Sequence, residues 1–150
     1  MIGVGIIGAG HFGAVHARAL AGLGNARLLA ACRKDAVGIG RFTAEHGGRA
    51  YTDWRALLDD PSVDAVVIAT PHDLHRDIAI ACLAAGKHVL LEKPMAITIE
   101  DCDAIAEAAA MAPGALMIGH VPRFFAPMQS AGEVIASGRN SRPIAGTSAS

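Results

Sequence analysis

The feature that most limits how this chain can fold is an alternation of short apolar runs with longer stretches of helical pattern, separated largely by glycine. The apolar runs contain few polar residues, which is typical of strands buried on both faces of a sheet. The expected strands are residues 2–7, 27–32, 64–69, 88–91 and 115–119, with a shorter one near Ala50. Strands that alternate with helices predict an α/β fold with a doubly wound, mostly parallel sheet and helices on both faces.

The stretches between these strands predict helices whose ends are marked by glycines and polar caps. Asp53 is a suitable N-cap for a short helix, and Thr98 followed by Asp101 resembles a capping box. The expected helices run from about residue 12 to 23, up to 46, over 54–60, from about 74 to 85, from 98 to 111 and from about 127 to 137. Ligands bind beyond the carboxyl ends of the strands in such sheets, so the residues directly after each strand are the candidates for chemistry.

A GxGxxG pattern follows the first strand and opens a helix. In this context Gly8 permits a tight turn, Gly10 lets the backbone approach a pyrophosphate, and Gly13 lets the helix pack closely on the strand. His11 and Phe12 complete the loop, whose N–H groups and helix dipole attract phosphate. The pattern therefore predicts a dinucleotide-binding fold of the Rossmann type.

The end of the second strand indicates which dinucleotide is preferred. An NAD-binding domain usually places an acidic residue there, where it accepts hydrogen bonds from the adenosine ribose. This chain has Arg33 and Lys34 instead, followed by Asp35. A guanidinium at this position can bind a 2′-phosphate with two hydrogen bonds, so NADP is predicted over NAD. The alternative is that both cations face solvent and Asp35 merely caps the next helix.

Three further segments, taken with the glycine loop, resemble a known family. They are the ATP-x-x-x-H segment that follows strand 64–69, the AGKHVLLEKPMA block around strand 88–91, and the later GH-x-x-RF. With the VGIIGAGHFG start, their order and spacing resemble the N-terminal domain of the glucose–fructose oxidoreductase, inositol dehydrogenase and rhizopine-catabolism (Gfo/Idh/MocA) family. The resemblance covers essentially all 150 residues.

The resemblance implies roles for residues after the later strands. Thr70, Pro71 and His75 would line the cofactor cleft, although His75 could instead cap the following helix. Arg123, in the RF segment, would border the nicotinamide or the substrate pocket. His72 and His120 lie near the same edge and are weaker candidates, whereas His16, His46 and His88 are expected to be structural or exposed.

The resemblance also implies a catalytic edge at the end of strand 88–91. Glu92, Lys93 and Pro94 form the family's motif there, and the bond between Lys93 and Pro94 is often cis in the family. Lys93 is the expected catalytic residue, because it would point at the nicotinamide ribose and the substrate hydroxyl and polarise that oxygen or relay its proton.

The family pattern divides the chain into a cofactor domain at 1–122 and, at 123–150, a connecting helix with the start of a substrate domain. The rest of that α+β substrate domain is expected to be absent from these 150 residues. The expected function is hydride transfer between NADP(H) or NAD(H) and a hydroxyl or carbonyl carbon of a sugar, polyol or cyclic diol. The alternative is a module or truncated fragment that binds NAD(P) without turnover.

Composition narrows the choice of partners. A formal net charge of −1 gives no electrostatic reason to expect nucleic acid or an anionic membrane, and no apolar run is long enough to span a bilayer. Cys32, Cys82 and Cys102 show no metal-binding spacing, so we expect no metal, buried free thiols and a cytoplasmic protein. An edge left by the absent domain is expected to favour self-association.

Overall fold

The computed structural model describes residues 1–120 and 126–138. The chain divides into two units, Met1–Gly119 and His120–Ser150. The first unit holds the whole sheet, and the second contains helix α6 (Ala126–Ala136), close to the helix expected at 127–137. The assignment of residues 123–150 to the start of a substrate domain stays a prediction.

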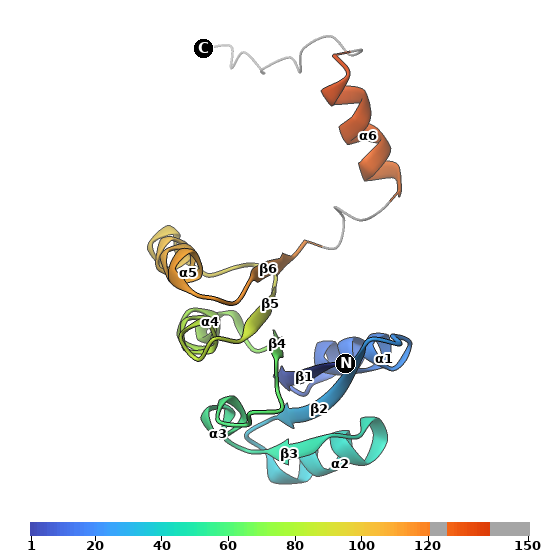
Figure 1. Ribbon diagram of the computed structural model, residues 1–150, viewed down its shortest axis with the longest axis vertical. Coiled ribbons are helices and arrows are strands. Elements are labelled where there is room, and N and C mark those ends of the chain that lie inside the picture. Colours follow the sequence, from blue (N-terminus) through green and yellow to red (C-terminus); the bar gives the residue numbers. More distant parts are fainter. Residues whose placement is uncertain (121–125, 139–150) are drawn as a thin grey trace, which may run out of the picture. The chain divides into compact units, whose positions relative to one another are not determined.

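The first unit is built on one six-stranded parallel sheet (Figure 1). The strands are β1 (Ile2–Ile7), β2 (Ala26–Cys32), β3 (Arg49–Tyr51), β4 (Ala65–Ile68), β5 (His88–Glu92) and β6 (Leu116–Gly119). Their order is β3-β2-β1-β4-β5-β6, and every neighbouring pair is parallel. The chain order reverses between β1 and β4, which is where ligands bind in open sheets of this type. The predicted doubly wound Rossmann sheet is confirmed.

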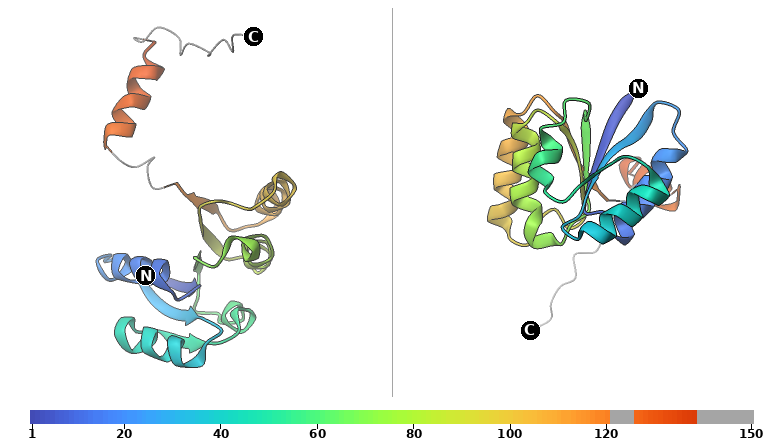
Figure 2. Two further views of the ribbon diagram at one scale, coloured as in Figure 1. Left: turned by 180° about the vertical axis from the view of Figure 1, so that it is seen from behind. Right: turned by 90° about the horizontal axis from the view of Figure 1, so that it is seen from below.

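Helices cover both faces of this sheet, as the apolar strands predicted. Helices α1 (His11–Ala21) and α2 (Ala36–His46) lie on one face, and α3 (Trp54–Leu58), α4 (His75–Ala84) and α5 (Ile99–Met111) lie on the other (Figure 2). A short 3-10 turn, η1 (His72–Leu74), leads into α4. Strand β6 lies at one end of the sheet, and self-association through this edge stays a prediction.

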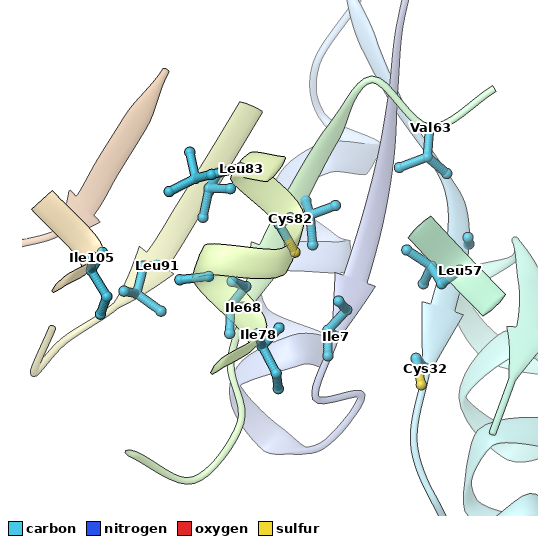
Figure 3. Packing of buried hydrophobic residues seen from close by; sticks show 14 residues of the cluster. Ile7, Cys32, Leu57, Val63, Ile68, Ile78, Cys82, Leu83, Leu91 and Ile105 are labelled. Carbon is cyan, nitrogen blue, oxygen red and sulfur yellow. The ribbon is translucent and has the colours of Figure 1, made fainter. Parts of the chain in front are cut away.

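Successive side chains of the strands enter two separate cores. Ile7 and Ile68 pack on the face covered by α3, α4 and α5 (Figure 3), whereas Ile6 and Val67 pack on the α1 and α2 face. A strand with apolar residues at every position is stable only when both faces are buried. Burying each of these side chains contributes about 1.5–3 kcal/mol, which explains why the strands are almost continuously apolar.

Two predicted N-caps are confirmed, and one predicted helix end is wrong. The side chains of Asp53 and Thr98 accept hydrogen bonds from backbone N–H groups of the helices that follow them. Helix α1 was expected to reach about Leu23, but it ends at Ala21, because the N–H groups of Gly22 and Leu23 donate to carbonyls three residues back, in the tighter 3-10 pattern. The earlier glycine of the pair therefore ends the helix.

The cysteines are free thiols, two of them in the core. Burial raises the pKa of Cys32 to about 11, with a smaller contribution from the charge of Asp53. Burial likewise raises the pKa of Cys82 to about 12, so both thiols stay protonated and unreactive at neutral pH. Cys102 is only partly buried, because it lies in the first turn of α5, and the expectation of burial was too strong for it.

The structure also bears on membranes and metals. Within residues 1–120 and 126–138, no helix combines the length and apolar character that a membrane crossing requires. The same described residues hold no group of three or more His, Cys, Asp or Glu side chains arranged to bind a metal ion.

Candidate functional site

The glycine loop lies at the switch point between β1 and β4, and its three glycines have three different physical roles. Gly8 has a φ of +99°, and a Cβ there would lie 2.5 Å from the backbone of Ala69. A Cβ on Gly13 would lie 2.5 Å from the carbonyl oxygen of Gly8. Gly10 has no atom within 4 Å of the position of a Cβ. Two glycines thus serve the fold, while Gly10 leaves open space beside the loop.

The helix that starts at this loop is open at its N-terminus. Helices α2, α3 and α5 are capped by side chains of Asp35, Asp53 and Thr98, whereas the N-cap of α1 is Gly10, which makes no side-chain cap. The first N–H groups of a helix have no partner within the helix. Those of α1, from His11 onward, are therefore available to an anion, which the helix dipole also attracts.

The loop is tied to the end of β2. The carbonyl oxygen of Cys32 accepts hydrogen bonds from the N–H groups of Gly8 and Ala9, both at 3.0 Å. The guanidinium of Arg33 donates to the carbonyl oxygen of Ala9 at 3.5 Å. These contacts hold the Arg33 side chain across the glycine loop, next to the place where phosphate would bind.

Asp35 has the capping role that the sequence left open. Its carboxylate accepts hydrogen bonds from the N–H groups of Val37 at 3.1 Å and Gly38 at 3.0 Å. It also lies 3.9 Å from the Arg33 guanidinium, and both side chains are about half exposed. The cap and the Arg33 position therefore coexist, so capping by Asp35 does not by itself remove Arg33 from the site.

A cavity of about 710 Å³ extends from the glycine loop across the ends of β1, β2 and β4. This volume is within the usual range for ligand pockets, about 300–1,000 Å³. The predicted residues that line it are Gly8, Arg33, Lys34, Thr70 and Pro71. A shallower hollow of about 320 Å³, which Arg33 also borders, is lined by Gly10 and His11 between α1 and α2. The adenosine-side residues named from the sequence therefore lie around one continuous edge.

Thr70 joins this cavity to a second, smaller one. It lines both the large cavity and a pocket of about 60 Å³ that is also lined by Phe12, Glu92 and Lys93. The Oγ1 atom of Thr70 is buried, and among the described residues it has no hydrogen-bond partner. Buried hydroxyls without a partner are rare in proteins and often mark a binding site. The open space at Gly10 and this hydroxyl both fit a dinucleotide lying along the edge.

His75 is placed differently from the other predicted residues. Its side chain is fully buried, with Nδ1 2.9 Å from the carbonyl oxygen of Pro94 and Nε2 3.0 Å from that of Thr70. Carbonyl oxygens only accept, so the ring nitrogen that carries the hydrogen donates to the carbonyl it faces, and a neutral ring donates to one of the two. His75 therefore lies beneath the cleft and links the loops after β4 and β5, and a direct contact with the cofactor stays a prediction.

The motif after β5 lies beside the small pocket. Lys93 is exposed, its backbone N–H donates to Glu92 Oε2 at 3.2 Å, and the peptide bond between Lys93 and Pro94 is cis, as the resemblance implied. Arg123 lies outside the described residues, so its expected place beside the nicotinamide stays a prediction.

One contact at this edge was missed from the sequence. His16 Nε2 on α1 donates to Glu92 Oε1 at the end of β5 at 2.8 Å. These residues are 76 positions apart, and only the packing of α1 against the sheet brings them together. The one local signal is that His16 follows the loop residue Phe12 by four positions, which places both on one face of the helix.

This fold and edge define a nucleotide-binding Rossmann domain: a parallel 3-2-1-4-5-6 sheet with a glycine loop and an open helix N-terminus at its switch point. Residues 2–120 match the Gfo/Idh/MocA family, described as an oxidoreductase family with an NAD-binding Rossmann fold. The chain belongs to this family.

Curated and solved relatives agree with this assignment. Inositol 2-dehydrogenase 2 of Saccharopolyspora erythraea is 38% identical over 144 residues, which are 94% of this chain and 42% of that protein. The WlbA dehydrogenase of Bordetella pertussis, solved with NADH and UDP-GlcNAcA, superimposes with a TM-score of 0.89 at 32% identity and covers 94% of this chain and 44% of that one.

A third relative was solved with the other dinucleotide. A variant of KijD10, a 3-ketoreductase from Actinomadura kijaniata in complex with TDP-benzene and NADP, superimposes with a TM-score of 0.83 at 27% identity. The superposition covers 91% of this chain and 42% of KijD10. The chain thus spans less than half the length of each of these three proteins.

Proposed function

We propose that this chain is the cofactor half of an enzyme that transfers hydride between NADP(H) and a hydroxyl or carbonyl carbon of a sugar, polyol or cyclic diol. The observation that carries the proposal is the alignment of the open α1 N-terminus, Arg33, Thr70 and Lys93 along one edge of the sheet. Mere binding of a dinucleotide needs only the first of these elements. A lysine at the far end of the same edge adds a group that can act on a substrate.

The residues along this edge would contact different parts of the cofactor and the substrate. The N–H groups at the start of α1 would hold the pyrophosphate, and Arg33 with Lys34 would hold the adenosine side. The bound dinucleotide supplies the hydride acceptor or donor. Lys93 would polarise the substrate oxygen or relay its proton, a contribution of about 10²–10⁴-fold in rate for general acid–base groups.

The preference for NADP rests on Arg33. Its guanidinium lies over the glycine loop and lines the large cavity, in the place where NAD-binding domains usually carry an acid. Asp35, 3.9 Å away, offsets part of this charge. Solved relatives include complexes with NADH and with NADP, so the choice depends on residues of this kind and not on the fold.

The substrate class follows from the relatives and not from a pocket in this chain. A relative with 38% identity is an inositol 2-dehydrogenase, which supports a polyol or cyclic substrate. The pocket beside Lys93, at about 60 Å³, is much smaller than an ordinary ligand pocket. This favours the second candidate function for residues 1–150 produced alone, which is binding of NAD(P) without turnover.

Calorimetric titration with NADPH and NADH tests the binding half of the proposal. We expect saturable binding of both, with NADPH tighter. The catalytic half is tested on a longer in-frame protein, where a panel of inositols, sugars and cyclic diols is followed by absorbance of the reduced nicotinamide. Lys93→Met should then lower kcat by about 10²-fold or more, a larger loss than the one in cofactor affinity. Absence of binding to the parent chain would refute the proposal.

A further inference from the structure

The contact between His16 and Glu92 joins the glycine-loop helix to the motif that carries Lys93. His16 Nε2 donates to Glu92 Oε1 at 2.8 Å, and the two side chains are 20% and 14% exposed. Exposed contacts between such groups contribute little to stability, but this pair is largely shielded from water. A shielded carboxylate that loses its partner is destabilised more than an exposed one.

The second oxygen of the same carboxylate reaches the lysine. Glu92 Oε2 accepts the backbone N–H of Lys93 at 3.2 Å, so one carboxylate connects α1 to the first residue after β5. Phe12, one turn before His16 on α1, lines the small pocket together with Glu92 and Lys93. On one face of α1, His16 thus contacts Glu92, and Phe12, four positions before it, lines the pocket that Glu92 and Lys93 also line.

We propose that His16 is a positioning residue: through Glu92 it fixes the Lys93 segment relative to the helix that binds the pyrophosphate. The contact that links α1 to β5 then fixes the spacing of two protein segments. One would bind the pyrophosphate of the cofactor, and the other would bind its nicotinamide end. This proposal rests on the proposed function, because it assigns the link a purpose only if a dinucleotide lies along the edge. It predicts that loss of the link weakens contacts at the nicotinamide end and leaves the adenosine end unchanged.

The test compares a whole cofactor with its adenosine fragment, on the 150-residue chain. The probes are whichever reduced cofactor binds the parent more tightly, NADPH or NADH, and the matching fragment, 2′,5′-ADP or ADP. His16→Leu should weaken binding of the reduced cofactor by about five- to twentyfold, less than the ten- to hundredfold for a lost direct hydrogen bond to a charged group, because the effect on the cofactor is indirect. Binding of the fragment should change by less than about twofold.

Conservative variants separate positioning from general destabilisation. His16→Gln places an amide N–H near the position of Nε2 and should restore most of the lost affinity. Glu92→Gln keeps the shape of the side chain and weakens the link from the other end. Asp101→Asn is the matched control, because it breaks a similar contact, 3.1 Å from Arg76, between α4 and α5 and should alter neither affinity.

Each outcome decides the matter. Equal losses for cofactor and fragment in His16→Leu and Glu92→Gln would overturn the proposal and make the pair purely structural. Unchanged affinity for both would overturn it as well. If His16→Leu fails to fold by circular dichroism, the same comparison is made with Glu92→Gln and His16→Gln. A parent chain that binds neither NADPH nor NADH refutes the proposed function itself, a result distinct from any of these.

Discussion

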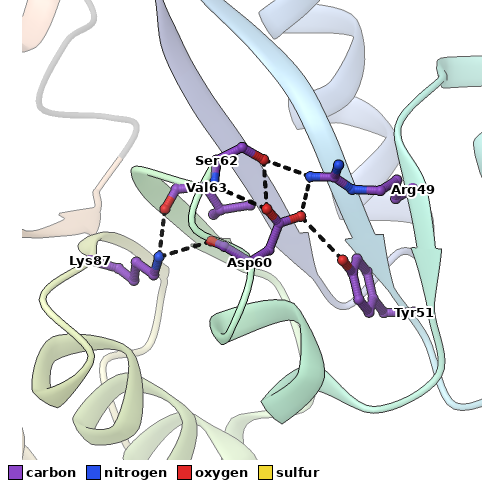
Figure 4. Close-up of polar contacts among 6 residues, drawn as sticks. All are labelled: Arg49, Tyr51, Asp60, Ser62, Val63 and Lys87. Atoms are coloured by element: carbon purple, nitrogen blue, oxygen red, sulfur yellow. Dashed lines mark hydrogen bonds and ion pairs between the residues drawn. The ribbon is translucent and has the colours of Figure 1, made fainter.

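The edge of the sheet formed by the carboxyl ends of the strands differs from the edge formed by their amino ends in whether its polar groups have hydrogen-bond partners. At the carboxyl edge, α1 begins without a side-chain cap and the Thr70 hydroxyl is buried without a partner among the described residues. Before β4 and β5, at the other edge, the carboxylate of Asp60 is buried and surrounded by donors (Figure 4). One edge leaves hydrogen-bonding capacity open for a ligand, and the other uses it within the chain.

The Asp60 cluster is a closed set of contacts. Asp60 accepts hydrogen bonds from Arg49, from the Tyr51 hydroxyl at 3.1 Å, and from the hydroxyl and N–H of Ser62 at 2.6 and 3.0 Å. Lys87 donates to the carbonyl oxygens of Asp60 and Val63 at 3.1 and 2.7 Å. Because the polar groups at this edge are satisfied within the chain, substitutions here should change the stability of the fold. Substitutions at the carboxyl edge should change cofactor binding.

The largest effect is expected from Gly10→Val at the carboxyl edge. The position is open and has an ordinary φ of −109°, so the variant should fold as the parent does. Its side chain would occupy the space beside the glycine loop and weaken NADPH binding by more than about 100-fold, since a pyrophosphate contact comprises several charge-assisted hydrogen bonds. Titration calorimetry with a thermal melt checks both halves. Unchanged affinity would mean that phosphate binds elsewhere.

The next effect is the exchange of cofactor preference by Arg33→Asp. One charge-assisted hydrogen bond contributes about 1.5–3 kcal/mol, so NADPH should be preferred about ten- to a hundredfold by the parent. The variant should abolish or reverse this ratio. Lys34→Asp reverses the neighbouring charge in the same cavity, and an equal shift in both variants would show that the preference follows the local positive charge and not a specific contact of Arg33. Equal affinities for NADPH and NADH in the parent would contradict the assignment of Arg33.

At the opposite edge, Asp60→Asn should lower the free energy of unfolding by about 1–3 kcal/mol without changing cofactor affinity. The Ser62 hydroxyl, the Ser62 N–H, the Tyr51 hydroxyl and the Arg49 charge together outweigh burial and lower the pKa of Asp60 from 3.8 to about 2. A carboxyl with a lowered pKa in the folded state stabilises fully above its unfolded pKa. The contribution is lost as the pH falls through about 2.

Urea unfolding between pH 7 and pH 2 measures this dependence. The difference in stability between the parent and Asp60→Asn should be constant above about pH 4 and should shrink below it. A difference that persists at pH 2 would mean that the charge of Asp60 is not what the cluster stabilises.

The smallest effects are expected from the removal of one hydroxyl at each edge of the sheet. Thr70→Val deletes a hydroxyl without a protein partner among the described residues, so stability should stay equal or rise slightly. NADPH affinity should fall about two- to tenfold if that hydroxyl meets the cofactor. Ser62→Ala removes the hydroxyl that contacts Asp60 and Arg49. This variant should lower the stability and leave the NADPH affinity unchanged. Thermal melts and titrations of both variants suffice, and the same pattern in both would erase the distinction between the edges.

The sequence alone determined the fold and named five of the residues that line the large cavity. Apolar strands, glycine positions and caps such as Asp53 and Thr98 depend on local backbone chemistry and on the burial of both strand faces, which are readable along the chain. The turn at Gly8 and the close packing at Gly13 follow from the same local rules. The family motifs, by resemblance, predict a catalytic edge at the end of β5, and this stays a prediction.

The tertiary structure decided which side chains meet. The contact of His16 with Glu92 spans 76 positions, and the ring of His75 bridges two loops from beneath the cleft. Neither is encoded in a local pattern, because each depends on how α1 and α4 pack across strands that are distant in sequence. The contacts of the Asp60 cluster with Arg49 and Lys87 are hidden from the sequence for the same reason. Side chains from distant elements meet only when the hydrophobic cores on the two faces of the sheet set the positions of the helices.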